Sequence, residues 1–252
     1  MGMRVVLSSL GVLVVTVTAL WLAGVTEAQT NQAATPTAST SVEELGRLLF
    51  WDPLLSGGRD VACATCHHPD FSYADGRDLS LGAGAVGLGP ARVDKSHGRI
   101  PTVKRNSSTI LNTAYNGLDD QRRRRGFDGT IASVDQARAP MFWDSRVRSL
   151  ETQALEPLKA LEEMRGATYT EAEAADIVVA RLRAVPAYVS RFEDAFGSGT
   201  AIDATHLGQA IAGFERSLVA MNSPFDRFRA GEHRNAHGAA TPWLQHVRRR
   251  GL

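Results

Sequence analysis

Apolar residues recur at helical spacing in four stretches of the chain, and no stretch alternates like a half-buried strand. The first stretch follows Ser41, which forms a capping-box pattern with Glu44. It should end near Asp52, because a residue before proline is disfavoured in a helix. Three more helices are predicted further on, starting after Thr170, at Pro186 and after Asp203. The pattern predicts a mainly α-helical fold with little or no β-structure.

Long loops are expected between these helices. Residues 71–90 contain five glycines and keep neither helical nor strand periodicity, which indicates an ordered loop. Glycine lets a backbone approach a ligand closely, although it is also common in ordinary turns. Residues 106–116 are predicted to begin with a short capped helix at Asn106.

The first 28 residues have the features of an export signal. Arg4 supplies a short positive region, an almost continuous apolar run follows, and small residues precede a cleavage site after Ala28. The alternative is an uncleaved membrane anchor, because the run approaches the roughly 20 residues that span a bilayer. We favour cleavage, since serines, threonines and a glycine dilute the run. The composition of residues 29–40 predicts a flexible linker. We expect residues 41–232 to form a periplasmic domain that has no stable association with the membrane once the signal is cleaved.

The chemistry of the sequence centres on Cys63-Ala64-Thr65-Cys66-His67. Two thiols at this spacing can each add to a vinyl group of a porphyrin, and the adjacent histidine then lies under the iron as its proximal ligand. One alternative is a redox-active cysteine pair, which does not need the histidine. Another is half of a zinc site, which needs two further soft ligands although the chain has no other cysteine. The motif therefore predicts one covalent haem c, held by Cys63, Cys66 and His67.

Composition narrows the range of partners. Of the 252 residues, 43% are hydrophobic and 22% are charged, which is ordinary for a globular protein, and the formal net charge is +1. So small a net charge produces no long-range field that would favour a nucleic acid as partner.

Several motifs, taken in order, resemble those of the bacterial di-haem cytochrome c peroxidases and the related MauG-type enzymes. Besides the C-x-x-C-H motif, they are Leu45–Phe50, Arg105–Asn112, Phe142–Arg146, Glu163–Met164 and Ser223–Arg227. The resemblance covers about residues 42–232. It implies a cytochrome c-like haem domain, equivalent to the N-terminal, peroxide-reacting domain of that family.

The resemblance also implies roles for individual residues. His67 corresponds to the proximal ligand of the peroxide-reacting haem. Gln153 and Glu163 fall where the family has a distal glutamine and an acid–base glutamate, and Trp143 matches a tryptophan on the electron path between two haems. Asn106 matches a residue that helps to hold a calcium ion, whose other ligands the family takes from its second haem domain.

Two features depart from the family pattern. Many relatives have a distal histidine in the loop after the C-x-x-C-H motif; its equivalent here falls at about Ala83, with His97 further along as a substitute to consider. No second C-x-x-C-H motif follows, and residues 233–252 show no apolar periodicity. We interpret this tail as a truncated or frame-shifted reading, with a genuine mono-haem protein as the alternative.

The resemblance predicts an exported haem peroxidase that reduces hydrogen peroxide with electrons from a small cytochrome or cupredoxin. Two alternatives stay open. A mono-haem electron-transfer cytochrome would need a sixth iron ligand, and Met141, Met164 and Met221 are the methionines to consider for it. An inactive truncated remnant would expose the surface that normally faces the second haem domain.

Overall fold

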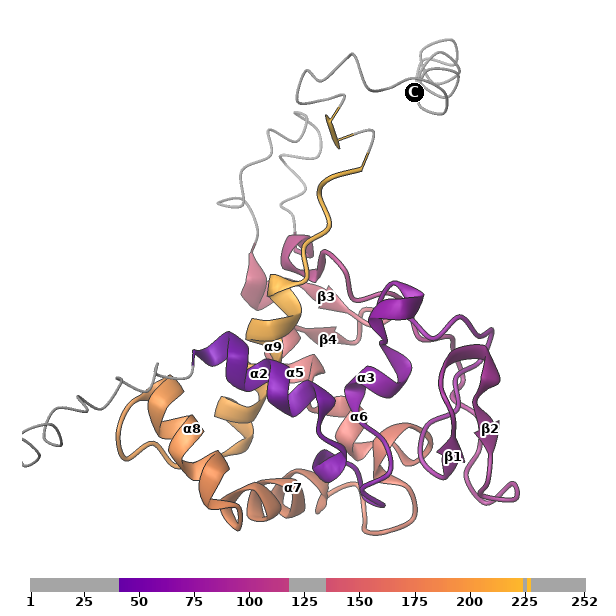
Figure 1. Ribbon diagram of the computed structural model, residues 1–252, viewed down its shortest axis with the longest axis horizontal. Helices are drawn as coiled ribbons and strands as arrows, with labels where there is room; N and C mark the ends of the chain where they lie inside the picture. Colours follow the sequence, from indigo (N-terminus) through magenta and orange to yellow (C-terminus); the bar gives the residue numbers. More distant parts are fainter. Residues whose placement is uncertain (1–40, 118–134, 224–225, 228–252) are drawn as a thin grey trace, which may run out of the picture. The chain divides into compact units, whose positions relative to one another are not determined.

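The computed structural model describes residues 41–117, 135–223 and 226–227 (Figure 1). The chain divides into Met1–Ala38 and Ser39–Leu252, and all described residues belong to the second unit. The predicted export signal, the linker and the tail at 233–252 lie outside the described residues. Within the described ranges, no helix is both long and apolar enough to cross a membrane.

A close crossing of two long helices forms the centre of the domain. Helix α2 (Val42–Trp51) packs along α9 (Ala204–Ser217), and Gly46 lies at the crossing. A β-carbon added to Gly46 would fall 1.8 Å from the carbonyl oxygen of Ala210, so only glycine lets the two backbones approach this closely. Next to it, the rings of Phe50 and Phe214 pack with their centroids 5.1 Å apart.

Two further helices cover the same core. Helix α7 (Ala174–Arg183) contacts α8 (Pro186–Phe196) and α9, and it also contacts the 3-10 turn η1 (Pro53–Leu55) that follows α2. Their apolar faces are buried, and Leu182 and Phe192 are fully enclosed. Burying one such side chain stabilises a fold by about 1.5–3 kcal/mol. In Figure 1 these helices lie on one side of the domain, and the long loops with β1 and β2 lie on the other.

Short elements joined by loops make up the rest of the described chain. They are α3 (Cys63–Cys66), η2 (Pro69–Phe71), β1 (Ala85–Val86), η3 (Gly89–Ala91), β2 (Val93–Asp94), η4 (Thr113–Tyr115), η6 (Gln136–Arg138), β3 (Pro140–Met141), β4 (Val147–Arg148), α5 (Leu150–Gln153), α6 (Glu156–Lys159) and the π-helix η7 (Leu161–Arg165). The strands form two antiparallel ribbons, in which Ala85 lies opposite Asp94 and Pro140 lies opposite Arg148. The described residues are therefore mainly α-helical with little β-structure, as predicted.

Three of the four predicted helix starts are confirmed, and the first of these differs from the prediction in its cap. The Ser41 side chain accepts a hydrogen bond of 3.1 Å from the Glu44 amide and caps α2. The Glu44 carboxylate pairs with Arg47 instead of returning to Ser41, so the capping box is incomplete. Helices α8 and α9 begin where the sequence predicts. Helix α7 begins at Ala174 with Glu173 as its N-cap, three residues later than a cap at Thr170 predicts. The Glu173 carboxylate instead accepts hydrogen bonds from the Thr170 amide and hydroxyl, which leaves residues 171–173 in a turn.

The prediction of a short helix at Asn106 is wrong. Residues 103–110 run as an irregular loop, because their amides bond to other segments of the chain. The amide of Ser107 donates to the hydroxyl of Ser80 at 3.0 Å, and the amide of Ile110 donates to the carbonyl of Tyr73 at 3.3 Å. Tertiary hydrogen bonds thus replace those of a helix.

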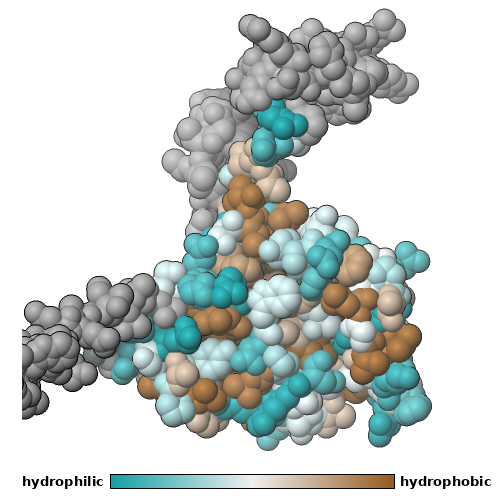
Figure 2. All heavy atoms as spheres, in the orientation of Figure 1, coloured by the Kyte–Doolittle hydropathy of each residue, from teal (hydrophilic) through white to brown (hydrophobic). Residues whose placement is uncertain are grey.

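The surface mixes polar and apolar side chains (Figure 2). Apolar surface gathers over β1 and β2, where Val86 and Val93 are exposed, and at the end of α9, near Val219 and Met221. Trp143 is the most exposed large apolar side chain among the described residues, at 65%, and it borders a cavity between α3 and α9.

Candidate functional site

A cavity of about 620 Å³ lies where α3, the loop at 103–116, the π-helix η7 and α9 meet. Its wall includes every residue to which the sequence analysis assigned a chemical role, namely Cys63, Cys66, His67, Asn106, Trp143, Gln153 and Glu163. Apolar side chains also contribute to the wall, among them Val61, Ile110, Leu150 and Ile211. The volume falls within the range of about 300–1,000 Å³ that is typical of small-molecule and cofactor sites.

Helix α3 is a single turn that brings both thiols to the cavity. Cys63 and Cys66 are its first and last residues, and residues three apart share one face of a helix. The Thr65 hydroxyl stabilises the start of the turn by accepting a hydrogen bond of 2.9 Å from the Ala62 amide. His67 follows as the C-cap, and its amide donates to the Cys63 carbonyl at 3.0 Å. The motif therefore presents two thiols and one imidazole to the same space.

The imidazole of His67 is oriented by the backbone. Its Nδ1 atom lies 3.1 Å from the carbonyl oxygen of Tyr73. With the proton on Nδ1, Nε2 keeps the lone pair that a metal needs, as in most histidine ligands. The Ser107 hydroxyl lies 3.3 Å from Nδ1 and 3.2 Å from Nε2. Because it is almost equally far from both nitrogens, it packs against the face of the ring and does not point at the lone pair of either one. Burial lowers the pKa of His67, which keeps the ring neutral, as ligation requires.

The two thiols are held in the protonated form. Burial raises the pKa of Cys66 to about 11, and burial together with the nearby Glu215 raises the pKa of Cys63. A redox-active cysteine pair needs the opposite, a thiol pKa lowered towards neutrality. A zinc site is not supported either, because no three His, Cys, Asp or Glu side chains in the described part of the chain could share a metal ion. The donor set and the partly apolar cavity instead fit a haem attached through thioethers.

Gln153 and Glu163 reach the cavity from two short helices. Gln153 ends α5, whose N-terminus is capped by the Ser149 side chain. Glu163 lies in η7, and π-helical turns occur frequently at functional sites. Burial raises the pKa of Glu163, the neighbouring Glu162 raises it further, and Arg146 opposes both. Glu163 therefore holds a proton at a higher pH than an ordinary glutamate does.

The glycine-rich loop predicted at 71–90 lies directly against the backbone of Glu163. The amide of Ala83 donates to the Glu163 carbonyl at 2.8 Å, and a β-carbon on Gly82 would fall 2.2 Å from the same oxygen. Arg92 is buried and holds this loop in place, donating to the carbonyls of Leu81 at 2.6 Å and Gly82 at 2.8 Å. The loop is ordered, as predicted, and the absence of a side chain at Gly82 lets the loop lie close to the backbone of η7.

Neither position considered for a distal histidine contributes to the cavity wall. Ala83, at the position of the missing histidine, is 5% exposed and packs in the hydrophobic core. His97 is exposed and lies outside the cavity wall, so it does not replace that histidine.

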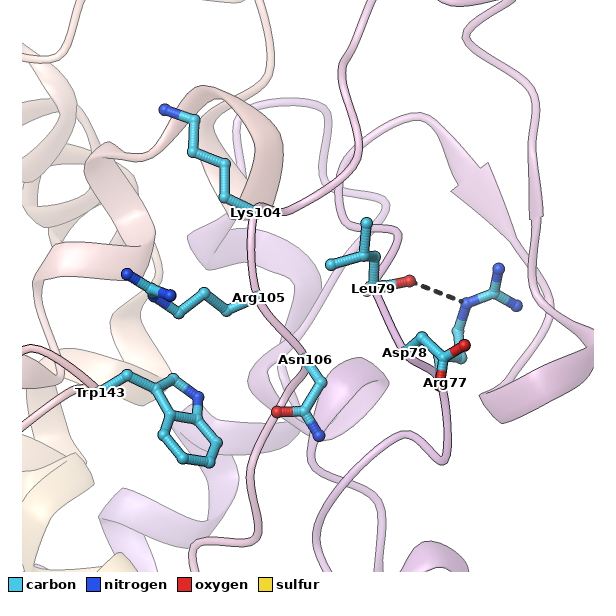
Figure 3. Close-up of a pocket in the computed structure, with 7 residues that line it drawn as sticks. All are labelled: Arg77, Asp78, Leu79, Lys104, Arg105, Asn106 and Trp143. Atoms are coloured by element: carbon cyan, nitrogen blue, oxygen red, sulfur yellow. Dashed lines mark hydrogen bonds between the residues drawn. The ribbon is translucent and has the colours of Figure 1, made fainter.

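Asn106 and Trp143 also line an open hollow of about 410 Å³ that adjoins the cavity (Figure 3). Its other lining residues are Arg77, Asp78, Leu79, Lys104 and Arg105. The hollow thus offers one carboxylate and one side-chain amide, whereas Ca²⁺ takes about 6–8 oxygen ligands. Calcium binding at Asn106 stays a prediction.

Glu215 is a cavity residue that the sequence analysis missed. It lies on α9, is 6% exposed, and its Oε2 atom has no hydrogen-bond partner among the described residues. Burial raises the pKa of Glu215 to about 8, against the lowering effect of Arg216. A signal for it was present, because Glu215 follows Ile211 by four residues and so occupies the apolar face of the helix.

Comparison with known proteins shows similarity across the described domain. A model of the family described as di-haem cytochrome c peroxidase matches residues 40–234. The chain is 36% identical over 188 residues to methylamine utilization protein MauG of Methylorubrum extorquens, covering 75% of this chain and 41% of that protein. It is 29% identical over 195 residues to cytochrome c551 peroxidase of Pseudomonas aeruginosa, covering 77% of this chain and 44% of that protein.

Solved structures share the fold. A MauG-like protein associated with microbial copper homeostasis matches with a TM-score of 0.55 at 23% identity, covering 78% of this chain and 45% of that one. The diheme peroxidase BthA from Burkholderia thailandensis matches with a TM-score of 0.50 at 19% identity, covering 74% of this chain and 41% of that one. The chain thus spans less than half the length of each of these relatives.

Proposed function

Because this chain belongs to the di-haem cytochrome c peroxidase family, we propose that it is an exported haem peroxidase domain with a cytochrome c-like fold. It binds one haem c covalently and reduces hydrogen peroxide with electrons from a small cytochrome or cupredoxin. The observation that carries the proposal is that one cavity wall holds the attachment motif together with Gln153 and Glu163. The features of residues 1–28 support export to the periplasm.

Cys63, Cys66 and His67 would hold the haem, whose iron supplies the site at which peroxide binds and its O–O bond is cleaved. The thiols lie on one face of a helical turn, at the spacing that two vinyl groups require. The bond from His67 to the Tyr73 carbonyl fixes the ring and increases its basicity as a ligand.

Glu163 is the acid–base group of this proposal. Reducing hydrogen peroxide to two water molecules takes two electrons and two protons, and one proton must also move from one peroxide oxygen to the other. The Glu163 carboxylate accepts that proton and returns it to the leaving oxygen, and such proton transfer contributes about 10²–10⁴ in rate. The raised pKa of Glu163 brings its proton affinity closer to neutral pH. The Gln153 amide can both donate and accept hydrogen bonds, which orients the peroxide.

Trp143 is the proposed entry point for electrons. Its indole is 65% exposed and belongs both to the cavity wall and to the adjoining hollow. The hollow also contains Arg77, Lys104 and Arg105, and these cations favour a donor protein with an acidic face (Figure 3).

The proposal is tested by producing the chain with a c-type haem maturation system. A pyridine haemochrome spectrum measures covalent haem, and peroxide consumption is then measured with a reduced small cytochrome. We expect thioether-linked haem in the wild type and half the thioether bonds in Cys63→Ser. A wild-type protein without thioether-linked haem would refute the proposal.

The acid–base role is tested separately on the haem-loaded protein. Glu163→Gln should slow the reaction with peroxide by about 10²-fold or more, without loss of haem. Glu171→Gln is the matched control, because Glu171 is exposed and is not part of the cavity wall. Equal rates in the two variants would remove Glu163 from the mechanism.

One observation favours a second candidate, an electron-transfer cytochrome. Met141 and Met164 are both buried in the cavity wall, where a thioether could supply the sixth iron ligand, whereas Met221 is exposed and lies outside the wall. The visible spectrum of the ferric protein separates the candidates. High-spin bands support the peroxidase, and fully low-spin bands support the carrier.

A further inference from the structure

The buried face of α9 carries a carboxyl group that the proposed reaction does not use, that of Glu215. Its neighbours on this face, Ile211 and Phe214, are buried apolar residues. Glu215 belongs to the cavity wall and is close enough to Cys63 for its charge to raise the pKa of that thiol. A carboxyl group therefore stands beside the position at which the haem would be attached.

The adjacent cation does not neutralise this group directly. The guanidinium of Arg216 binds the carboxylate of Glu151 on α5 at 2.6 Å. The Oε2 atom of Glu215 has no partner among the described residues. An ionised carboxylate without a partner is strongly disfavoured in such a place, so the group keeps its proton to an unusually high pH.

The other ionisable groups on elements packed against α9 are paired or exposed. Glu44 pairs with Arg47 on α2, and the guanidinium groups of Arg181 and Arg183 on α7 donate to backbone carbonyls. Tyr115, on η4, donates to the sulfur of Met221, and Glu43 and Asp176 are exposed. Elsewhere in the cavity wall, the ionisable groups are Cys63, Cys66, His67, Lys104, Arg105, Asp144, Arg146, Glu162 and Glu163. Arg146 pairs with Asp144 at 3.0 Å, and Lys104 lies 3.9 Å from Glu162. Arg216 is the charge that lowers the pKa of Glu215, and burial outweighs it.

We propose that Glu215 is a proton-binding site of the haem cavity whose proton occupancy is coupled to the oxidation state of the iron. The inference rests on the haem binding proposed above. When a one-electron donor reduces the ferric iron, one positive charge that stabilises the carboxylate is lost, and the carboxylate takes up one proton from solvent. On reoxidation, the electron and the proton both leave. One electron and one proton therefore balance, and the net charge of the cavity is unchanged.

The test is a potentiometric titration of the haem-loaded protein over a range of pH that spans the pKa of Glu215. The wild-type reduction potential should fall with rising pH by at most about 59 mV per pH unit, the one-electron equivalent of a tenfold change in proton concentration. Glu215→Gln keeps the shape of the side chain but cannot ionise, so this pH dependence should disappear. In Glu163→Gln it should remain, because Glu215 is still present.

A pH dependence that persists unchanged in Glu215→Gln would overturn the inference, and so would its loss in Glu163→Gln alone. If Glu215→Gln yields no folded holoprotein, infrared difference spectra of Glu163→Gln decide the matter. The spectra are recorded at a pH above the pKa of Glu215 in the oxidised protein. A protonated-carboxyl signal that appears when the haem is reduced supports the inference, and the absence of that signal refutes it. Haem content is measured first, so a protein without thioether-linked haem counts against the proposed function instead.

Discussion

Replacing Gly46 by alanine should force apart the two helices at the centre of the domain. The added β-carbon would fall 1.8 Å from the Ala210 carbonyl oxygen, whereas ordinary van der Waals contact begins at 3.4 Å. The obstacle is helix backbone, which has no rotamer to change, so α2 and α9 must separate by more than 1 Å near the crossing.

The cost follows from the packing that this separation weakens. A gap of about 0.5–1 Å already forfeits a quarter to a half of the dispersion energy between packed atoms. Leu45, Leu49 and Phe50 are the buried side chains of α2 on either side of Gly46, and the side chain of Phe214 on α9 lies against it. At about 2 kcal/mol each, a quarter to a half of their burial energy amounts to roughly 2–4 kcal/mol.

Gly213→Ala is the matched control. A β-carbon on Gly213 would lie 3.2 Å from the Cγ1 methyl group of Val42, the end of a side chain and not backbone. Both substitutions gain the same helix propensity of about 1 kcal/mol, so the comparison cancels that contribution. The expected difference of about 2–4 kcal/mol corresponds to roughly 6–12 °C in Tm for a domain of this size.

The assay is thermal unfolding of the two haem-loaded variants, followed by far-ultraviolet circular dichroism at equal haem content. Gly46→Ala should melt well below Gly213→Ala, and Gly213→Ala should melt at or slightly above the wild type. If the two variants melt at the same temperature, the close approach of α2 and α9 at Gly46 does not limit the stability of the domain.

Three further predictions concern the site. Gly82→Ala should lower the rate of reaction with peroxide by about 10²-fold at unchanged haem content. The added β-carbon would push the Glu163 carbonyl away and displace the Glu163 side chain. Stopped-flow kinetics measure this rate, and a wild-type rate in the variant would contradict the prediction. The rate of the wild type should rise with pH as Glu163 loses its proton, at a pH above the usual range for glutamate because burial raises its pKa, and the profile of Glu163→Gln should be flat there. The folded-state pKa of Glu215 is raised from 4.5 to about 8, so the stability it contributes is present below pH 4.5 and is lost as pH rises towards 8. Urea unfolding at several pH values should show this loss in the wild type and not in Glu215→Gln; parallel curves would exclude it.

The roles of Gln153, Glu163 and Trp143 came from resemblance to a family and not from any local pattern. A glutamate in a charged stretch and a tryptophan next to phenylalanine are common in proteins of every class. The structure adds that these three side chains share a cavity with the C-x-x-C-H motif, which sequence separations of 76 to 100 residues could not show. Their chemical roles remain predictions.

The sequence by itself determined the features that depend on neighbours a few residues away. Ser41, Pro186 and Asp203 mark helix starts, because a cap or a fixed φ acts within one turn. Cys63 and His67 belong to a motif whose geometry is that of a single helical turn.

Only the tertiary structure decided the features that depend on distant segments. Asn106 lies in a loop and not in a helix, because amides near it bond to Ser80 and Tyr73. Glu215 is a polar residue in a helix by sequence, and it becomes a buried acid with a raised pKa only because α3, η7 and α9 meet around one cavity. Burial and unpaired polar atoms are properties of the assembled core, and a local sequence pattern carries no information on which distant segment will cover a given side chain.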